Sequence, residues 1–222
     1  MLAMRIPKVT IESIVSAAFE ENCFLARMED HQDCLVIDPG LEPDKILLRL
    51  KRQQLTPIAI LNTHGHADHI AGNTVLKEAY PACPLIIGHG DADKLTDPVK
   101  NLSAGFGVGL TSPPPDRIVR EGDVLELAGF ELTVRETPGH SAGHVVFVTQ
   151  GLEPVHLFGG DVLFAGSVGR TDFPDGSWEQ LRASIQEKLF GLPDDTVVYT
   201  GHGPTTTIGQ EKRSNPYVGL NA

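Results

Sequence analysis

The sequence has little cysteine, and the few cysteines form no pairing pattern. Cys23, Cys34 and Cys83 are the three present, and no two of them stand in a CxxC spacing. Three thiols cannot all pair, so we expect buried, reduced side chains rather than a disulfide framework. This cysteine usage is typical of a reducing compartment.

Long apolar runs and an excess of positive charge are also missing. No stretch approaches the roughly 18 to 20 apolar residues that a membrane span requires, and the first residues lack the regions of a signal peptide. Lys and Arg number 18 against 29 Asp and Glu, a net charge of −11. That sign disfavours nucleic acid and acidic membrane surfaces as partners. We therefore expect a cytoplasmic protein that binds neither.

The rest of the composition is that of an ordinary globular chain. The 222 residues are 41% hydrophobic and 21% charged, enough to bury one large core. No repeat appears at a period of about 20 to 50 residues, which excludes a solenoid or propeller. We expect residues 1–222 to form a single domain. The oligomeric state is left open.

Hydrophobic periodicity predicts two strand-rich passes with helices between and after them. Strands are predicted at 9–15, 23–26 and 35–37, a helix at 43–53, a buried strand at 58–61 and a helix at 70–80. The second pass has strands at 85–87, 124–127, 130–135, 145–148 and 155–158, a helix at 177–189 and a strand at 197–199. Residues 97–116, rich in Gly and Pro, form a long connection that is either a lid or disordered.

The strongest chemical signal is the segment THGHADH at 63–69. It places His64, His66, Asp68 and His69 between a buried strand and a helix, where α/β folds bind ligands. Imidazole and carboxylate groups are ligands of divalent ions such as zinc. A helix cap would account for Asp68 but not for three histidines. The segment therefore predicts a metal site, although four neighbouring ligands cannot readily surround one ion.

Three later segments supply further candidate ligands, each after a predicted strand and beside glycine. They are His140 in TPGH, Asp161 in FGGD and His202 in TGHG. Each would be weak evidence alone, because a lone histidine is more often structural. Together with the first cluster they make five histidines and two aspartates, enough for two ions that share one carboxylate.

The order THGHADH, TPGH, GGD and TGHG resembles the metallo-β-lactamase superfamily, and in particular its glyoxalase II (hydroxyacylglutathione hydrolase) branch. The segment GDVLFAGSVGRTDFPDGS and the ending TTTIGQEKRSNPYV are similar to the compact, single-domain hydrolases of that branch. The resemblance implies an α/β fold, an αββα sandwich with its site at one edge. It also implies the ligand sets: His64, His66 and His140 for one ion, Asp68, His69 and His202 for the other, and Asp161 between them.

The resemblance implies supporting and substrate-contacting residues as well. Asp38 in VIDPG matches a carboxylate that orients a ligand histidine from behind, although an ordinary Asp-Pro-Gly turn would read the same way. His144 matches a supporting histidine. Arg170 and Asp172 fall where glyoxalase II contacts glutathione, but the family's Lys-Phe-Tyr is replaced here by Arg-Thr-Asp. A local ion pair between Arg170 and Asp172 that only shapes the loop is the alternative.

The length of the chain bears on the comparison with full-length glyoxalase II. That enzyme carries a C-terminal helical domain that helps to bind glutathione, whereas this chain ends 20 residues after His202. We therefore expect that domain to be missing.

The activity implied is hydrolysis of a thioester, S-D-lactoylglutathione or a related acyl-thiol, as the small-molecule partner. Two divalent ions, most simply zinc, with iron or manganese as options, would share a bridging hydroxide as the nucleophile. Asp68 would both hold the second ion and orient that hydroxide, which makes it the predicted catalytic residue. Residues 169–173, GRTDF, also resemble mononuclear iron persulfide dioxygenases. Those enzymes usually carry Cys where His144 stands, which favours the hydrolase; lactam hydrolysis and a non-catalytic metal-binding module stay open.

Overall fold

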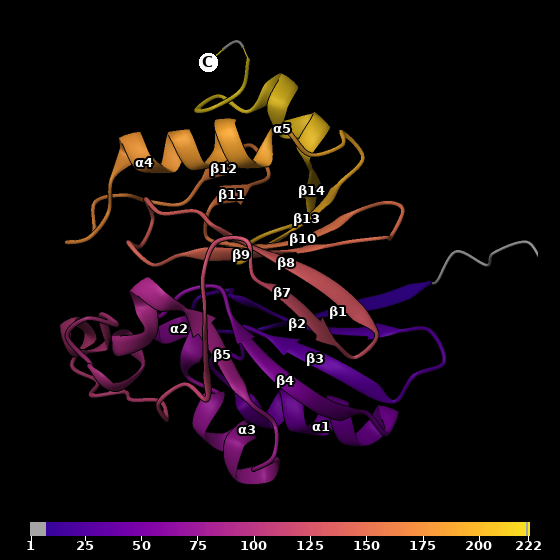
Figure 1. Cartoon of the computed structure of the whole chain (residues 1–222). Helices are drawn as coiled ribbons and strands as arrows, with labels where there is room; N and C mark the ends of the chain where they lie inside the picture. The colour runs from indigo at the N-terminus through magenta and orange to yellow at the C-terminus, as the bar shows by residue number, and fades with distance from the viewer. Residues whose placement is uncertain (1–7, 221) are drawn as a thin grey trace, which may run out of the picture.

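Two β-sheets lie face to face, and helices cover their outer sides (Figure 1). The computed structural model describes residues 8–220 and 222. Helices α1 (Pro43–Gln53) and α3 (Asn73–Ala79) cover the first sheet, and α4 (Trp178–Ala183) and α5 (Ile208–Ser214) cover the second. This arrangement is the αββα sandwich that the sequence predicted.

The first sheet has six strands in sequence order. They are β1 (Val9–Val15), β2 (Asn22–Met28), β3 (Asp33–Ile37), β4 (Thr56–Asn62), β5 (Leu85–Gly88) and β6 (Arg117–Val119). The first three strands are antiparallel, whereas β3, β4, β5 and β6 run parallel. The carboxyl ends of β3 and β4 therefore meet at the same edge of the sheet.

The second sheet also has six strands, in the order β14-β13-β10-β9-β8-β7. Their bounds are β7 (Val124–Leu127), β8 (Phe130–Glu136), β9 (Val145–Thr149), β10 (His156–Gly160), β13 (Val197–Thr200) and β14 (Thr206–Thr207). Strands β10 and β13 are parallel, and the other pairings are antiparallel. A separate hairpin joins β11 (Leu163–Phe164) to β12 (Ser167–Val168).

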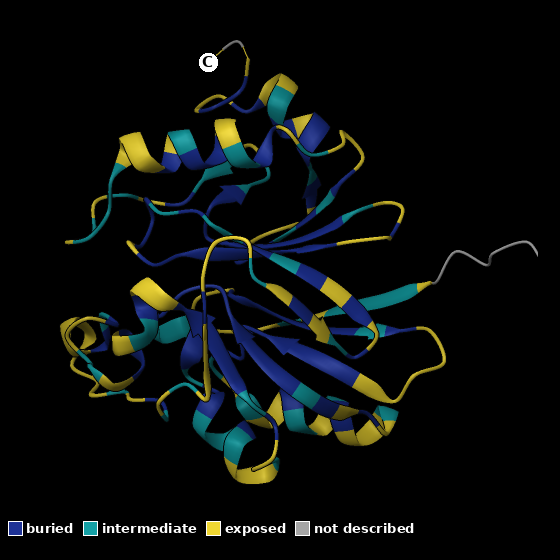
Figure 2. Ribbon diagram, viewed as in Figure 1, coloured by how far each residue is buried: buried dark blue, intermediate teal, exposed yellow. Residues whose placement is uncertain are grey.

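Apolar side chains fill three layers of the sandwich. Phe24, Leu61, Phe147 and Phe158 belong to the cluster between the two sheets, to which both sheets contribute. A second cluster lies between the first sheet and its helices, and a third between the second sheet and α4 and α5. Figure 2 shows the sheets as largely buried and the outward sides of the helices as exposed. The core thus fixes the two sheets against each other.

The first predicted helix has the expected boundaries. Helix α1 runs from Pro43 to Gln53 and buries Ile46 and Leu50 against the first sheet. Lys51 and Arg52 stand in its last turn, where cations favour the helix dipole.

The predicted helix at 70–80 is wrong in its boundaries. A short helix, α2 (Ala67–Ile70), begins three residues earlier and includes Asp68 and His69, and α3 begins only at Asn73. The backbone N–H of Gly72, between them, donates to the carbonyl of Pro39 at 2.7 Å. This long-range contact interrupts the helix, and local periodicity does not reveal it.

The helix predicted at 177–189 is present but changes its winding. It begins as α4, capped by the side chain of Ser177, and continues as the π-helix η3 (Ser184–Leu189). The short strands β6, β11, β12 and β14 and the helix α5 were not predicted. Segments of two or three residues are too short to show a period.

The connection at 97–116 is ordered and follows the 3₁₀ helix η1 (His89–Thr96). It contains a second 3₁₀ helix, η2 (Ser103–Phe106). The side chain of Asn101 donates to the carbonyls of Lys94 and Leu110 at 3.1 and 2.9 Å, which ties the segment together. Of the two interpretations offered by the sequence, disorder is wrong.

The three cysteines lie in the apolar cluster between the first sheet and its helices. Cys23, Cys34 and Cys83 are free and buried, as expected. Within residues 8–220, none of the helices combines the length and the apolar character that crossing a membrane would demand.

Candidate metal centre

All seven predicted ligands meet at one edge of the sandwich, just beyond the ends of four strands. The segment with His64, His66, Asp68 and His69 follows β4, His140 follows β8, Asp161 follows β10 and His202 follows β13. Their ligand atoms form three groups in which all atoms lie within 4.8 Å of one another. The groups are His64, His66 and His140; His64, His69 and Asp161; and Asp68, His69 and His202.

Asp161 lies between the two predicted ligand sets. Its Oδ2 is 3.5 Å from Nε2 of His140, a member of the first set, and 3.5 Å from Nε2 of His202, a member of the second. Its Oδ1 is 3.4 Å from Nε2 of His69. One carboxylate thus reaches both sets, as a bridging ligand must.

Four of the histidines are held from behind through Nδ1. The partner atoms are the carbonyl oxygen of Arg170 for His140 at 2.8 Å, the carbonyl of Phe19 for His202 at 2.9 Å, Oγ1 of Thr63 for His64 at 3.1 Å and Oδ2 of Asp38 for His69 at 3.2 Å. An outer partner of this kind fixes the ring of a metal-ligating histidine and leaves Nε2 for the ion.

Four of the atoms that face the centre have no hydrogen-bond partner, whereas Nε2 of His140 contacts Nδ1 of His66 at 2.9 Å. Nε2 of His64, His66 and His69 and Oδ1 of Asp161 are buried and unpartnered. Leaving a buried polar atom unsatisfied is costly, so such a cluster requires an explanation. Divalent ions that accept the lone pairs of these atoms would provide it, and the residues therefore fit a metal centre.

Burial and neighbouring charges shift the pKa values of the histidines in the centre in different directions. Burial lowers the pKa values of His64, His66 and His140, which keeps their rings neutral, the form that binds a metal. For His202, burial is outweighed by hydrogen bonds to Asp161 and Asp68, which raise its pKa to about 10.

The carboxylates of the centre stay ionised. Burial alone would raise the pKa of Asp161, but His69 and His202 hold it well below its usual range. Burial also opposes ionisation of Asp68, and His69 and His202 again lower its pKa. Both predicted aspartate ligands therefore carry negative charge at neutral pH.

Asp38 and His144, the two predicted supporting residues, lie behind the predicted ligands and contact them. Asp38 accepts from the backbone N–H and the hydroxyl of Thr63, both at 2.7 Å, besides contacting His69. His144 Nε2 accepts from the backbone N–H of Asp161 at 3.1 Å. Asp38 thus fixes the start of the histidine segment, and His144 fixes the backbone of the central aspartate.

The first and last parts of the centre are joined by direct contacts. The amide of Asn22 donates to the carbonyls of Thr200 and Gly203 at 2.9 and 2.8 Å, and the Asn22 N–H donates to the carbonyl of Gly201 at 2.7 Å. A Cβ on Gly201 would lie 2.1 Å from Oδ1 of Asp161. Only glycine lets the backbone before His202 pass this close to the central carboxylate.

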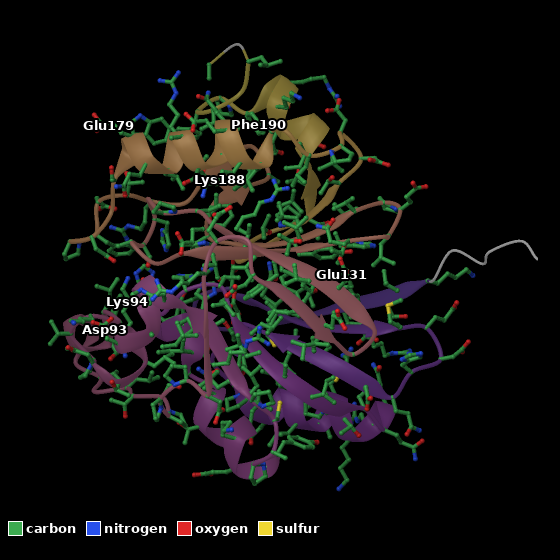
Figure 3. The ribbon with its side chains drawn as sticks, viewed as in Figure 1. Asp93, Lys94, Glu131, Glu179, Lys188 and Phe190 are labelled. Atoms are coloured by element: carbon green, nitrogen blue, oxygen red, sulfur yellow. The ribbon has the colours of Figure 1, made fainter. Side chains whose placement is uncertain are left out.

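A buried ionic network that the sequence did not reveal lies behind His66 and His140. Asp91 accepts from the backbone N–H groups of Gly65 and Gly143 at 2.9 and 2.8 Å and from the hydroxyl of Ser141. Lys94 Nζ lies 3.2 Å from Asp91 Oδ1 and 2.6 Å from Asp175 Oδ2. Lys94, labelled in Figure 3, stands where the first half of the chain faces the second. The network therefore ties together the loops that carry the ligands.

Two further residues at the centre were also missed. Phe173 packs edge-on against the rings of His66 and His140, with centroids 5.0 and 5.6 Å apart. Glu21 is fully buried with both carboxylate oxygens unpartnered, and burial raises its pKa well above the usual value. Local sequence does not reveal Glu21, because its burial depends on segments that are distant in the chain, such as the one with His202.

A pocket of about 440 Å³ opens directly onto the centre. Its lining includes His66, Asp68, His140, Asp161 and His202, and its opposite walls are mostly apolar. The segment 97–116 forms one of these walls.

Arg170 and Asp172, the two predicted substrate-contacting residues, form a salt bridge with each other. Arg170 donates from Nε and Nη2 to the two carboxylate oxygens of Asp172 at 2.7 and 2.6 Å, and both side chains are exposed. The hydrogen bond from Arg170 lowers the pKa of Asp172 to about 2. Arg170 lines the pocket, and its guanidinium lies 4.3 Å from the ring centroid of Phe173. The geometry is that of the local ion pair offered as the alternative.

The chain is similar to known proteins over nearly its full length. It is 40% identical over 213 residues to hydroxyacylglutathione hydrolase GloC of Haemophilus influenzae, covering 95% of this chain and 98% of that protein. The crystal structure of BLEG-1 B3 metallo-beta-lactamase superposes with a TM-score of 0.89 at 36% identity, over 94% of this chain and 99% of that one.

A second solved structure resembles the chain and contains metal. TTHA1623 in a di-iron-bound form has a TM-score of 0.81 at 37% identity, over 93% of this chain and 99% of its own. The family model of the metallo-beta-lactamase superfamily matches residues 17–202, a range that contains all seven predicted ligands. This chain is a member of the metallo-beta-lactamase superfamily.

Proposed function

We propose that the chain is a binuclear metal-dependent hydrolase that cleaves a thioester, S-D-lactoylglutathione or a related acyl-thiol. The observation that carries the proposal is the convergence of buried, unpartnered ligand atoms of His64, His66, His69 and Asp161. Of these residues, His66 and Asp161 also line the pocket. The 40% identity to a hydroxyacylglutathione hydrolase supports the substrate class.

The proposed ligand sets follow the geometry of the side chains. His64, His66 and His140 would hold one ion, Asp68, His69 and His202 the other, and Asp161 would contact both. Zinc is the first candidate, and iron or manganese fits the same nitrogen and oxygen donors. Two bound metal ions would supply Lewis acidity and would lower the pKa of a bound water molecule toward neutrality.

The protein's own groups would orient the reaction. Asp68 Oδ2 lies 3.3 Å from Nε2 of His202 and lines the pocket, so we assign it to orienting the attacking water as a catalytic residue. Phe173 covers His66 and His140 on the pocket side and would exclude bulk water. A thiolate is a good leaving group, so no dedicated acid is required.

The test is metal analysis combined with a thioester assay. The metal-loaded protein is expected to contain two ions per chain and to remove thioester absorbance in a metal-dependent way, and Asp161→Asn should lose most of both. Glu179→Gln, on the exposed face of α4 (Figure 3), is the matched control and should behave like the wild type. Absence of metal-dependent thioester loss over several acyl-thiols would contradict the proposal.

A mononuclear iron persulfide dioxygenase is the second candidate, favoured by the GRTDF segment. The di-iron form of TTHA1623 supports iron as the metal, but its two ions fit the binuclear hydrolase. One iron per chain with oxygen uptake on glutathione persulfide would support it, and two ions without uptake would support the hydrolase. The cytoplasmic location, the lack of nucleic acid partners and the single-domain organisation stay predictions from the sequence.

A further inference from the structure

We propose that the acyl group of the substrate is an uncharged, apolar chain or ring that binds in the pocket beside the metal centre. This inference rests on the proposed thioester hydrolysis and adds the class of acyl group. It concerns the pocket walls rather than the ligands.

Apolar side chains from three separate segments form these walls. Phe19 comes from the loop after β1, Leu102, Phe106 and Val108 come from the segment 97–116, and Phe164 and Val168 come from the β11–β12 hairpin. None of these segments supplies a predicted ligand. Their common feature is an apolar surface that faces the pocket.

Several of these side chains are unusually exposed. Phe106 is 69% exposed, Val108 54% and Phe19 46%, and the Phe19 and Phe106 rings meet edge to face at 5.7 Å. Single exposed apolar residues need no explanation, but a group of them at the mouth of one pocket indicates a surface that a ligand covers. A hydrocarbon group would remove this surface from water.

Away from the proposed metal ions, free positive charge is scarce in the pocket. Apart from the histidines of the centre, Arg170 is the only cationic side chain that lines it within the described part of the chain, and Asp172 already occupies its guanidinium. Ser103, a polar lining residue, uses its hydroxyl to accept from the Leu110 N–H at 3.1 Å. A carboxylate placed among these walls would lose its hydration without gaining a partner.

The distribution of charge indicates which arm of the thioester, the acyl group or the thiol, enters the pocket. Common thiol carriers such as glutathione bear carboxylates, and the chain has a net charge of −11. The thiol arm therefore extends into solvent past Arg170, and the acyl arm, bonded directly to the carbonyl, enters the apolar pocket.

The test is a series of glutathione thioesters with lactoyl, acetyl, butyryl, hexanoyl and phenylacetyl groups, assayed on the metal-loaded full chain. Burying a methylene is worth up to about fourfold, so kcat/KM should rise at least about tenfold from acetyl to hexanoyl. Phe106→Ser should flatten this rise. Val99→Ser, 71% exposed in the same segment but outside the pocket lining, should preserve it.

A binding measurement separates the pocket from turnover. Ketone analogues, in which a methylene replaces the thioester sulfur, cannot be hydrolysed, and calorimetry on the metal-loaded chain should show their affinity rising with acyl length in the wild type but not in Phe106→Ser. Hydrolysis that prefers lactoyl, or ignores acyl length, with flat ketone affinities would overturn the inference and leave the hydrolase standing. Length-dependent ketone binding without any thioester cleavage would support the pocket and refute the hydrolase. A length dependence on the thiol arm, tested with acetyl thioesters of different thiols, would also overturn the inference.

Discussion

Asp91 and Asp93 are separated by one residue, yet the structure gives them opposite surroundings. Asp91 is fully buried, accepts from the Gly65 and Gly143 N–H groups and pairs with Lys94. Asp93 is exposed and pairs with Lys100 on the surface. A buried charge that loses its partner is far more costly than an exposed one.

This contrast gives a matched pair of substitutions. Asp91→Asn should lower the free energy of unfolding by about 3 kcal/mol, because Lys94 keeps its charge with only Asp175 to balance it. Asp93→Asn should change it by less than about 0.5 kcal/mol. Urea denaturation measures both values, and equal effects would show that the network does not hold the loops.

The buried thiols provide a second test at this scale. Burial raises the pKa of Cys34 to about 12 and that of Cys83 to about 11. Both pKa values are higher than those of the thiols in the unfolded chain, so the folded protein keeps these thiols protonated at pH 8. The unfolded chain releases their protons first, so the folded state loses stability only as the pH rises above about 9. Iodoacetamide at pH 8 should leave the native protein unmodified and should label it after unfolding in urea. Rapid labelling of the native protein would contradict the burial.

The sequence could single out the seven predicted ligands, which the structure brings together, but it could not single out the residues behind them. The spacing of His64, His66, Asp68 and His69 is local, so it is visible without a structure. Asp91 acts through Gly65, Ser141 and Gly143, and an isolated aspartate in a polar stretch gives no sign of contacts so distant in sequence. Metal chemistry selects a small set of residue types, whereas almost any carboxylate can serve as a buried anchor.

At the scale of elements, the loop that carries His140 is packed directly onto helix α4. Gly139 has φ +136°, and a Cβ there would lie 2.2 Å from the backbone nitrogen of Leu181. Both the backbone conformation and the space therefore require glycine. The position of His140 depends on this contact between a ligand loop and an outer helix.

Gly139→Ala should therefore be strongly destabilising, by about 3 kcal/mol or more, and should weaken metal binding. Gly191→Ala has open space around the new Cβ and no positive φ, so it should change stability by less than about 1 kcal/mol. Thermal unfolding and metal titration measure the two effects. Equal melting temperatures for the two variants would refute the packing argument.

Element boundaries were predictable where the pattern is local and failed where tertiary contacts intervene. Helix α1 carries its own signals, with Pro43 at the start and cations at the end. The break at Gly72 depends on Pro39, which lies outside the helical pattern. Local periodicity therefore did not predict the division between α2 and α3.

At the scale of the whole molecule, the centre joins the two halves of the sandwich. The first sheet supplies the segment with His64, and the second sheet supplies His140, Asp161 and His202. Ions bound between the two sheets would stabilise the folded chain but not the unfolded chain, because the unfolded chain cannot bring these side chains together.

Metal removal should therefore lower the melting temperature. With one site and free metal at 100 times its dissociation constant, binding adds about 2.7 kcal/mol, and a chelator should remove it. His202→Ala should reduce this metal-dependent shift, while His31→Ala, at an exposed position outside the centre, should retain it. Differential scanning calorimetry measures the melting temperature with and without metal. If the metal-dependent shift of His202→Ala were as large as that of the wild type, the assignment of His202 as a ligand would be contradicted.

The contacts of Asn22 and Phe19 with residues 200–203 have a consequence during synthesis. A nascent chain cannot close the centre until β13 and the residues after it have left the ribosome tunnel, since His202 is positioned by the backbone of a segment made some 180 residues earlier. A metal centre that uses both predicted ligand sets could therefore be completed only late in synthesis, after both ends of this contact have been made.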